Sequence, residues 1–351
     1  MDQATINGIA PSAIATIPYF ENMFPNLATG GMTATQFIYN NLWSSGSVGN
    51  ETFPLYTLDT GACYTPGSPC AGIAPGPLNR YFAAQYSSLY AWATVGTSSY
   101  HSMQLSLHHA LQHGLQFDFD YTLARSIDLG SDAERTSYQQ GQNFSSIINA
   151  FNIKGNRGVS DFDTRHAISA NFGYKLPFGK GAMFGSGVNP IVNTFISGWN
   201  LSGLTHWTSG LPFSGDDGAG WGTDWASQSF ALVTGKVASG GHHIEGGEPN
   251  AFPNVAAALN NITAPFAGVS GQRNAFRGDG YFSIDSSLAK LFTITETQNL
   301  KFQWDVFNAT NSVRFDPHSV QNNPFSASSF GVYSAQLVLP RAMQFSLRYS
   351  F

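Results

Sequence analysis

Apolar and polar side chains alternate through long segments of the chain from about residue 99 onward. In residues 115–124, Leu, Phe, Phe, Tyr and Leu alternate with Gln, Asp, Asp, Thr and Ala. The same period of two recurs in 300–306 and again in 343–351. Such a period predicts strands that have one apolar and one polar face. A helix would instead place Asp118 and Asp120 on nearly opposite sides.

We expect a set of long antiparallel strands, each of roughly 12 to 16 residues, whereas strands in soluble sheets average about five or six. A tilted strand needs about 9–11 residues to cross a bilayer. The predicted strands cover 99–110, 114–126, 163–176, 194–208, 278–293, 297–310 and 340–351. Their length favours an all-β, antiparallel transmembrane β-barrel segment, with too few strands for a complete barrel.

The predicted connections alternate between short and long. Short ones fall near Gln112, Gly185 and Glu296, and long ones cover 127–162, 209–277 and 311–339. Outer-membrane barrels have short periplasmic turns and longer external loops. We therefore expect the short turns, including the glycine-rich GKGAMFGSG segment, on the periplasmic side and the long loops outside.

Residues 1–98 show no sustained alternation, because short aromatic pieces are interrupted by Gly, Asn, Pro and Ser. We interpret them as a loop-rich N-terminal region, mostly an external loop of the parent barrel, and 99–351 as the barrel strands. The chain start has no basic stretch followed by an apolar core, so no signal peptide is visible. We expect that the natural protein starts further upstream.

The composition supports a membrane barrel. Charged residues make up 11% of the chain, against roughly 25% in soluble domains. The sequence contains no apolar run of about 18 residues, which excludes a transmembrane helix, and the apolar residues are dispersed as a barrel requires. The net charge of −5 and the lack of basic clusters argue against nucleic-acid binding.

The two cysteines, Cys63 and Cys70, lie in a segment rich in Gly, Pro and Ser. Their spacing allows a small disulfide loop in an oxidising compartment. Two free thiols are the alternative, and a metal site is disfavoured because no His lies near them.

Few residues are spaced as metal ligands. The candidates are His109 with His113, His242 and His243 with Glu245 and Glu248, and Asp216, Asp217 and Asp224 in a glycine-rich loop. The first His pair falls at a strand end and turn, where a four-residue spacing does not align ligands. The Asp group lacks the alternating ligands and closing Glu of an EF-hand. We expect no metal or cofactor, with a loose external contact at the second His pair as the alternative.

The sequence shows no catalytic arrangement. It lacks a nucleophile elbow and a phosphate-binding loop. Four carboxylates lie in alternating strands, where we interpret them as polar residues facing the barrel lumen: Asp118, Asp120, Asp285 and Asp305. General acid–base work would need a closed pocket around them, so we expect no enzyme.

Aromatic side chains gather toward the predicted strand ends. They are Phe172, Tyr174, Trp199, Trp207, Tyr349 and Phe351. Girdles of aromatic rings mark the two interfaces of membrane barrels, and packing in a sandwich core is the alternative.

Several segments resemble the C-terminal barrel of TonB-dependent outer-membrane receptors, in particular the Oar-like branch. The similar segments are 100–132, 156–181, 196–214, 273–311 and the terminal QFSLRYSF. PYFENMFP at 18–25 is similar to loop sequence of that branch. The resemblance spans most of 100–351.

This resemblance implies a barrel of about 22 strands with a plugged lumen, which imports a scarce solute of the siderophore, glycan or peptide class using energy passed through TonB. The chain shows no plug and no TonB-contacting segment, so we expect a C-terminal fragment that meets the TonB system only through the missing plug. The implied partners are outer-membrane lipid of a Gram-negative bacterium and the barrel-assembly machinery. Residues that this machinery would read as an assembly signal are Phe345, Leu347, Tyr349 and Phe351.

Two other functions are compatible with parts of the pattern. A complete small porin or adhesin is disfavoured by the odd number of predicted strands, because single-chain bacterial barrels have even numbers. A secreted carbohydrate-binding β-sandwich is disfavoured by the strand length and by the terminal Phe351.

Overall fold

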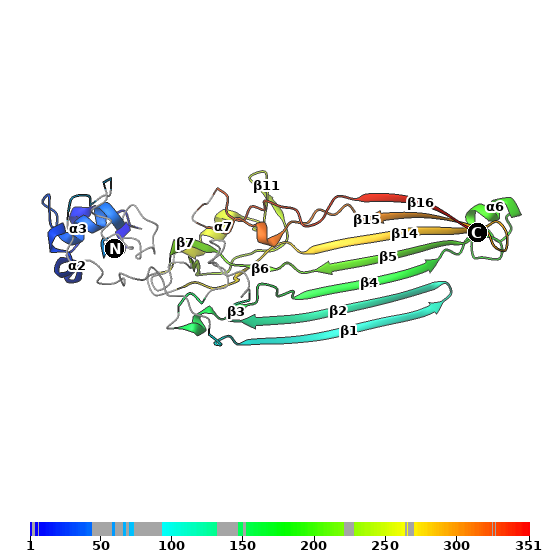
Figure 1. Cartoon of the computed structure of the whole chain (residues 1–351), viewed down its shortest axis with the longest axis horizontal. Helices are drawn as coiled ribbons and strands as arrows, with labels where there is room; N and C mark the ends of the chain where they lie inside the picture. The colour runs from blue at the N-terminus through cyan, green and yellow to red at the C-terminus, as the bar shows by residue number, and fades with distance from the viewer. Residues whose placement is uncertain are drawn as a thin grey trace.

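The computed structural model shows a long antiparallel sheet with short turns at one end and folded loops at the other (Figure 1). It describes residues 1, 4–5, 7–43, 58–59, 66–67, 70–73, 93–131, 147–149, 152–220, 228–263, 265, 270–324, 326 and 328–351. Among these residues, no helix has the length and apolar character needed to cross a membrane.

The main sheet has the strand order β1-β2-β4-β5-β14-β15-β16, and the short β3 pairs with β2. The strands are β1 (Ser98–Gln112), β2 (Leu115–Asp128), β3 (Gly158–Val159), β4 (His166–Lys175), β5 (Trp199–Thr208), β14 (Tyr281–Thr293), β15 (Asn299–Phe307) and β16 (Ala342–Ser350). Each long strand pairs with the next long strand of the chain. The sheet is open, with β1 and β16 at its edges, and the predicted all-β antiparallel class is confirmed.

The predicted strands are all present, but several are shorter than expected; β15 and β16 have 9 residues each. The largest error lies at the start of the strand predicted over 194–208, because helix α6 (Pro190–Ile196) occupies its first residues. Asn189 caps this helix, since its side-chain oxygen accepts a hydrogen bond from the Val192 amide at 2.9 Å. A capping Asn followed by Pro favours a helix start locally, and this preference prevails over the alternation.

Two of the predicted short turns are tight. β1 and β2 are joined by His113 and Gly114, which both have positive φ, at 53° and 84°. Two-residue hairpin loops with positive φ match the twist of the flanking strands. β14 and β15 are joined by 294–298, whereas β4 and β5 are joined by the longer segment 176–198 that contains α6.

The long loops fold together into what we call the loop cap, formed by the described residues of 129–165, 209–280 and 308–341. Its elements are β6 (Pro212–Phe213), β7 (Asp216–Gly220), β8 (Gln228–Phe230), β9 (Leu232–Val233), β10 (His243–Glu245), β11 (Glu248–Asn250), α7 (Val255–Leu259), β12 (Ile262–Thr263), β13 (Phe276–Arg277) and a 3-10 helix at Pro317–Ser319. β6 pairs with β13, β7 with β8, β9 with β12 and β10 with β11. The cap has its own apolar core, centred on Phe213, Phe252, Phe276 and Phe330. The sequence patterns predicted the loops but not this core.

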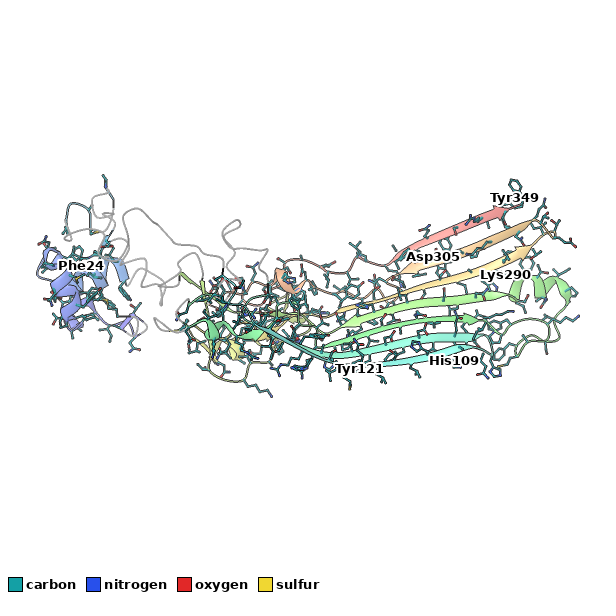
Figure 2. The ribbon with its side chains drawn as sticks, turned by 60° about the horizontal axis from the view of Figure 1, so that its bottom comes forward. Phe24, His109, Tyr121, Lys290, Asp305 and Tyr349 are labelled. Carbon is teal, nitrogen blue, oxygen red and sulfur yellow. The ribbon has the colours of Figure 1, made fainter. Side chains whose placement is uncertain are left out.

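The N-terminal residues form a small helical cluster. Its elements are α2 (Pro18–Met23), α3 (Ala34–Ile38), 3-10 turns at Pro11–Ala13 and Pro25–Leu27, and a π-helical turn at Tyr39–Trp43. Phe24, Leu27 and Ile38 are buried in its core together with Leu58 and Cys70, and Figure 2 labels Phe24 there. The assignment of 1–98 to an external loop of the parent barrel stays a prediction.

Candidate functional site

One face of the long sheet is apolar across every strand, and we call it the apolar face. The register places its side chains opposite one another: Met103, Leu105, Leu107, Phe117, Phe119, Tyr121, Ile168, Phe172, Tyr174, Trp199, Leu201, Ile284, Leu288, Phe302, Trp304, Met343, Phe345, Leu347 and Tyr349. Leu105 is 58% exposed and Leu347 is 67% exposed. Apolar patches of this extent mark a surface that meets a membrane or another protein.

Cross-strand contacts order the apolar face although it is open. The rings of Trp304 and Phe345 stack with centroids 5.8 Å apart, and Trp199 meets Phe302 edge to face at 6.0 Å. Phe172 packs over Gly203, where a Cβ atom would lie 2.4 Å from its ring. This face therefore has a defined shape, and the few polar side chains among its apolar ones include Thr205, Ser286 and Lys290.

The opposite face carries most of the polar side chains of the strands, as predicted. Asp118 lies 2.8 Å from Nδ1 of His108 across the β1–β2 pair, and Asp120 accepts a hydrogen bond from Ser106 at 2.5 Å. Asp305 accepts one from Gln303 at 2.7 Å, and Figure 2 labels it on β15. Leu204, Leu291 and Phe307 are exceptions on this face.

Asp285 also has a partner, because its Oδ1 accepts a hydrogen bond from the Asn308 amide at 2.8 Å. The four carboxylates singled out in the strands are therefore hydrogen-bonded by neighbours in the sheet or, for Asp285, at its end. These contacts are typical of carboxylates that stabilise neighbouring strands on the polar face of a sheet.

A buried arginine connects the end of the sheet to the loop cap. The Arg273 side chain is only 1% exposed and forms ion pairs with Asp128, the last residue of β2, and with Asp161 at 2.9 Å. Its Nε donates to the Asn156 carbonyl at 3.2 Å. Buried charges are stable only when paired and hydrogen-bonded in this way, so Arg273 fixes the position of three chain segments.

A second arginine repeats this arrangement next to the first. Arg277 forms an ion pair with the buried Asp163 and donates to the Gly210 carbonyl at 3.1 Å. Asp163 in turn accepts a hydrogen bond from the Ser126 amide at 2.6 Å. The ends of β2 and β5 are thereby connected to the segment that precedes β14.

A further buried carboxylate of the cap is Asp279. Its Oδ2 lies 2.8 Å from Nδ1 of His242 and accepts a hydrogen bond from the Phe315 amide at 3.1 Å. Its Oδ1 pairs with Arg314 at 3.4 Å. Burial, followed by the nearby Asp279 charge, raises the pKa of Tyr333, which donates its hydroxyl to the Gly241 carbonyl at 2.8 Å.

Sequence reasoning missed this network of cap ion pairs. A signal was present, because two Arg four residues apart and two Asp two residues apart stand out in a chain with only 11% charged residues. Nothing in the spacing says that 161–163 and 273–277 meet, since they are more than a hundred positions apart.

The predicted metal candidates are dispersed. His109 stacks on Phe117 with centroids 5.2 Å apart, and His113 lies in the following turn. Nε2 of His243 is 3.1 Å from the Gly240 carbonyl oxygen, and Glu245 stands opposite Glu248 in the β10–β11 hairpin.

The described part of the chain holds no group of three or more His, Cys, Asp or Glu side chains placed to bind a metal ion. Asp216 and Asp217 belong to β7, and Asp224 lies outside the described residues.

Cys70 is buried in the N-terminal cluster and is disulfide-bonded. Cys63 lies outside the described residues. The predicted pairing of Cys63 with Cys70 therefore stays a prediction.

The C-terminal strand places Phe345, Leu347 and Tyr349 on the apolar face. Phe351 follows β16, is 93% exposed, and stacks on Tyr349 with ring centroids 5.8 Å apart. Its role as an assembly signal stays a prediction. Trp199 begins β5 and Tyr349 lies near the end of β16, at the short-turn end of the sheet; the aromatic girdle stays a prediction.

Comparison with known families gives one result. The family model described as "Outer membrane beta barrel domain" matches residues 33–344, which include nearly all of the long sheet and the loop cap. No curated protein matches the chain, and no solved structure does.

Proposed function

Because the chain belongs to the family of outer membrane beta barrel domains, we propose that it forms the C-terminal part of the barrel wall of a TonB-dependent receptor. Membership of this family implies an outer-membrane location. The proposal adds a Gram-negative host and a part in the uptake of a scarce solute of the siderophore, glycan or peptide class.

The observation that carries the proposal is the single-layered sheet with an apolar and a polar face. Burying apolar surface is worth about 25 cal/mol per Å² in water, so exposed side chains such as Leu105, Phe345 and Leu347 favour a non-aqueous surrounding. Lipid-facing and lumen-facing residues alternate along the strands of a membrane barrel. A β-sandwich would instead cover this face with a second sheet.

The open edges favour a wall within a larger barrel. In hydrocarbon, each unpaired backbone group costs several kcal/mol, so spanning sheets close on themselves. β1 and β16 are each paired on one side in the described structure. A receptor barrel of about 22 strands would provide strands for both edges.

In this proposal the loop cap faces the outside and offers the first contacts to a solute. Arg273, Arg277 and Asp279 hold its segments in fixed positions, and a fixed outer surface suits selective binding. In the proposed receptor, the TonB system would act through a plug domain that is separate from the strands and cap described here.

A labelling experiment tests the wall. Nitroxide labels at Phe119 and Trp304, on the apolar face, are expected to be accessible to oxygen dissolved in lipid. Labels at Asp118 and Gln303, their neighbours on the polar face, should report water or protein contact. Equal lipid exposure at the four positions would contradict the assignment of a barrel wall.

Two further measurements test the receptor assignment. A continuous upstream reading frame that encodes a plug would support it, as would TonB-dependent uptake lost on deletion of this chain. The 351 residues expressed alone should not give a compact monomer in detergent that unfolds only on boiling. Such a monomer would favour a complete small porin or adhesin.

A further inference from the structure

The turn between β4 and β5 carries an apolar helix at the short-turn end of the sheet (Figure 1). This helix, α6, has the sequence PIVNTFI and contains no charged residue. Ile191 is 74% exposed and Phe195 is 65% exposed. A short uncharged helix that shows its apolar side chains calls for an explanation, because water disfavours such a surface.

Further exposed apolar side chains lie in the same turn, and together they form what we call the turn patch: Phe178, Met183, Phe184, Ile191, Val192 and Phe195. The rings of Phe178 and Phe184 are in contact, with centroids 5.6 Å apart. The second part of the patch, α6, is joined to the first by a hydrogen bond, because the Lys180 amide donates to the side-chain oxygen of Asn193 at 2.6 Å.

The C-terminal end of α6 is attached to the sheet by two side chains. Nζ of Lys290, on β14, donates hydrogen bonds to the carbonyl of Thr194 at 2.5 Å and to that of Ser197. Nε1 of Trp199 donates to the Phe195 carbonyl at 2.9 Å. Carbonyls at the end of a helix lack partners within the helix, so these donors fix α6 in place. Figure 2 labels Lys290 near this end of β14.

The attachment shows on which side of the sheet α6 lies. In the register, Lys290 stands opposite Trp199 on one side and Phe302 on the other. All three side chains therefore project from the apolar face. Lys290 is only 3% exposed, and its Nζ lies 4.8 Å from the centroid of the Phe292 ring.

The position of Lys290 on this face requires an explanation, because a cation that faces lipid is destabilising, most strongly at the bilayer midplane. Here the ammonium is surrounded by helix carbonyls and aromatic rings rather than by hydrocarbon. The arrangement keeps α6 on the outer side of the wall, next to the aromatic side chains at the strand ends.

We propose that the turn patch inserts into the phospholipid leaflet around the short-turn end of the wall, with α6 as an interfacial helix and Lys290 as its positioning residue. The inference rests on the proposed lipid contact of the apolar face, with which the turn patch is continuous through Trp199. Apolar helices at membrane surfaces bury their apolar side at the boundary between headgroups and acyl chains.

The test uses the full-length protein inserted into bilayers of phosphatidylethanolamine and phosphatidylglycerol, with nitroxides at Ile191→Cys and Phe195→Cys. Both labels should respond more to oxygen than to a water-soluble nickel chelate, at a shallower depth than a label at Leu347→Cys. Asn200→Cys is the matched control, because it follows Trp199 but projects from the polar face, and its label should favour the nickel chelate.

The outcomes separate this inference from the proposed wall. If Leu347 reports lipid while Ile191 and Phe195 report water, the interfacial helix is wrong and the wall stands. If Leu347 also reports water, the wall itself is wrong. A photo-reactive residue at Phe195 should crosslink to phospholipid, and a crosslink to protein instead would overturn the proposal.

The role of Lys290 is tested through mobility. Lys290→Met should release α6 and narrow the spectral lines of a label at Phe195, without changing a label at Leu347. Lys290→Arg, which keeps the charge and donors, should restore the broad lines. Lys301→Met, on the polar face of β15, is the control and should change neither label. Unchanged lines in Lys290→Met would overturn the positioning role.

Discussion

The long sheet and the loop cap use the same kinds of residue in opposite ways. On the sheet, Phe345 and Leu347 project outward and remain open, while backbone pairing holds the strands together. In the cap, Phe252 and Phe276 are fully buried and pack edge to face with centroids 5.2 Å apart. The cap thus buries its apolar side chains, as soluble proteins do. The sheet exposes them on one face, as is expected of a surface that contacts lipid.

Charges show the same contrast. The sheet keeps its carboxylates on one face, where Asp118 and Asp120 are exposed and bonded to neighbours. The cap buries Arg273 and Asp163 almost completely. Removing one partner of a buried pair leaves an uncompensated charge, whereas an exposed pair contributes little. Mutations in the two regions are therefore expected to differ in size and in kind.

The largest expected effect is the loss of the buried arginine of the cap. Arg273→Leu leaves Asp128 buried without its cation and should destabilise the cap by about 3–5 kcal/mol. Hydrogen exchange should show it as lost protection in 152–165 and 270–280, with protection in the long strands unchanged. Arg341→Leu, an exposed arginine, is the control and should change stability by less than about 0.5 kcal/mol. Equal effects of the two variants would contradict the contrast.

A charged substitution on the apolar face tests the same contrast between sheet and cap, this time in the sheet. Phe345→Arg should destabilise the protein in bilayers by about 2–4 kcal/mol, the cost of an arginine near the bilayer centre. Gln344→Arg, one residue earlier and on the polar face, should have an effect close to zero. Denaturant unfolding in lipid measures both, and a larger loss for Gln344→Arg would mean that the faces are assigned the wrong way round.

The third prediction separates assembly from stability. Deleting Phe351 in the full-length protein should slow insertion and leave precursor in the periplasm, with normal stability for what does insert. An aromatic that served only as an interfacial anchor would lower stability by no more than about 1–3 kcal/mol and leave insertion unaffected. Pulse-chase fractionation distinguishes the two, and normal insertion kinetics would reject the signal.

The smallest effect concerns the N-terminal cluster, which resembles the cap in burying its apolar side chains. Burial alone raises the pKa of Glu21, but hydrogen bonds from Thr35 and Ala34 at the start of α3 hold this pKa below its usual value. A lowered pKa in the folded state stabilises above the unfolded pKa, and this contribution is lost as the pH falls through the folded pKa.

Glu21→Gln should therefore cost about 0.3–1 kcal/mol at neutral pH, the usual value of a carboxylate at a helix start, and nothing in strong acid. Hydrogen exchange of α3 at neutral pH and in acid below the folded pKa of Glu21 measures the difference. Glu296→Gln, in the β14–β15 turn, should leave α3 unchanged at both pH values. A cost that persists in acid would show that the amide disturbs packing instead.

The sheet could be predicted from the sequence because its pattern is local. Alternation in 115–124 or 343–351 can be recognised within a single strand, and β2 and β16 lie where it predicts them. The cap could not be predicted, because its contacts join residues such as Arg273 and Asp128 that are distant in the chain. The position of α6 was missed for another reason. Its apolar residues are compatible with a strand, but Asn189 and Pro190 before them favour the start of a helix.

The order of the strands in the sheet is also their order along the chain, which has a consequence for how the protein folds. Pairing β5 with β14 closes the segment 209–280, and this loop closure costs about 3 kcal/mol more than closing the two-residue turn between β1 and β2. The cap reduces this entropic cost, because Phe213, shortly after β5, pairs with Phe276, shortly before β14. A cap that folds early would therefore hold β5 and β14 next to each other before they pair.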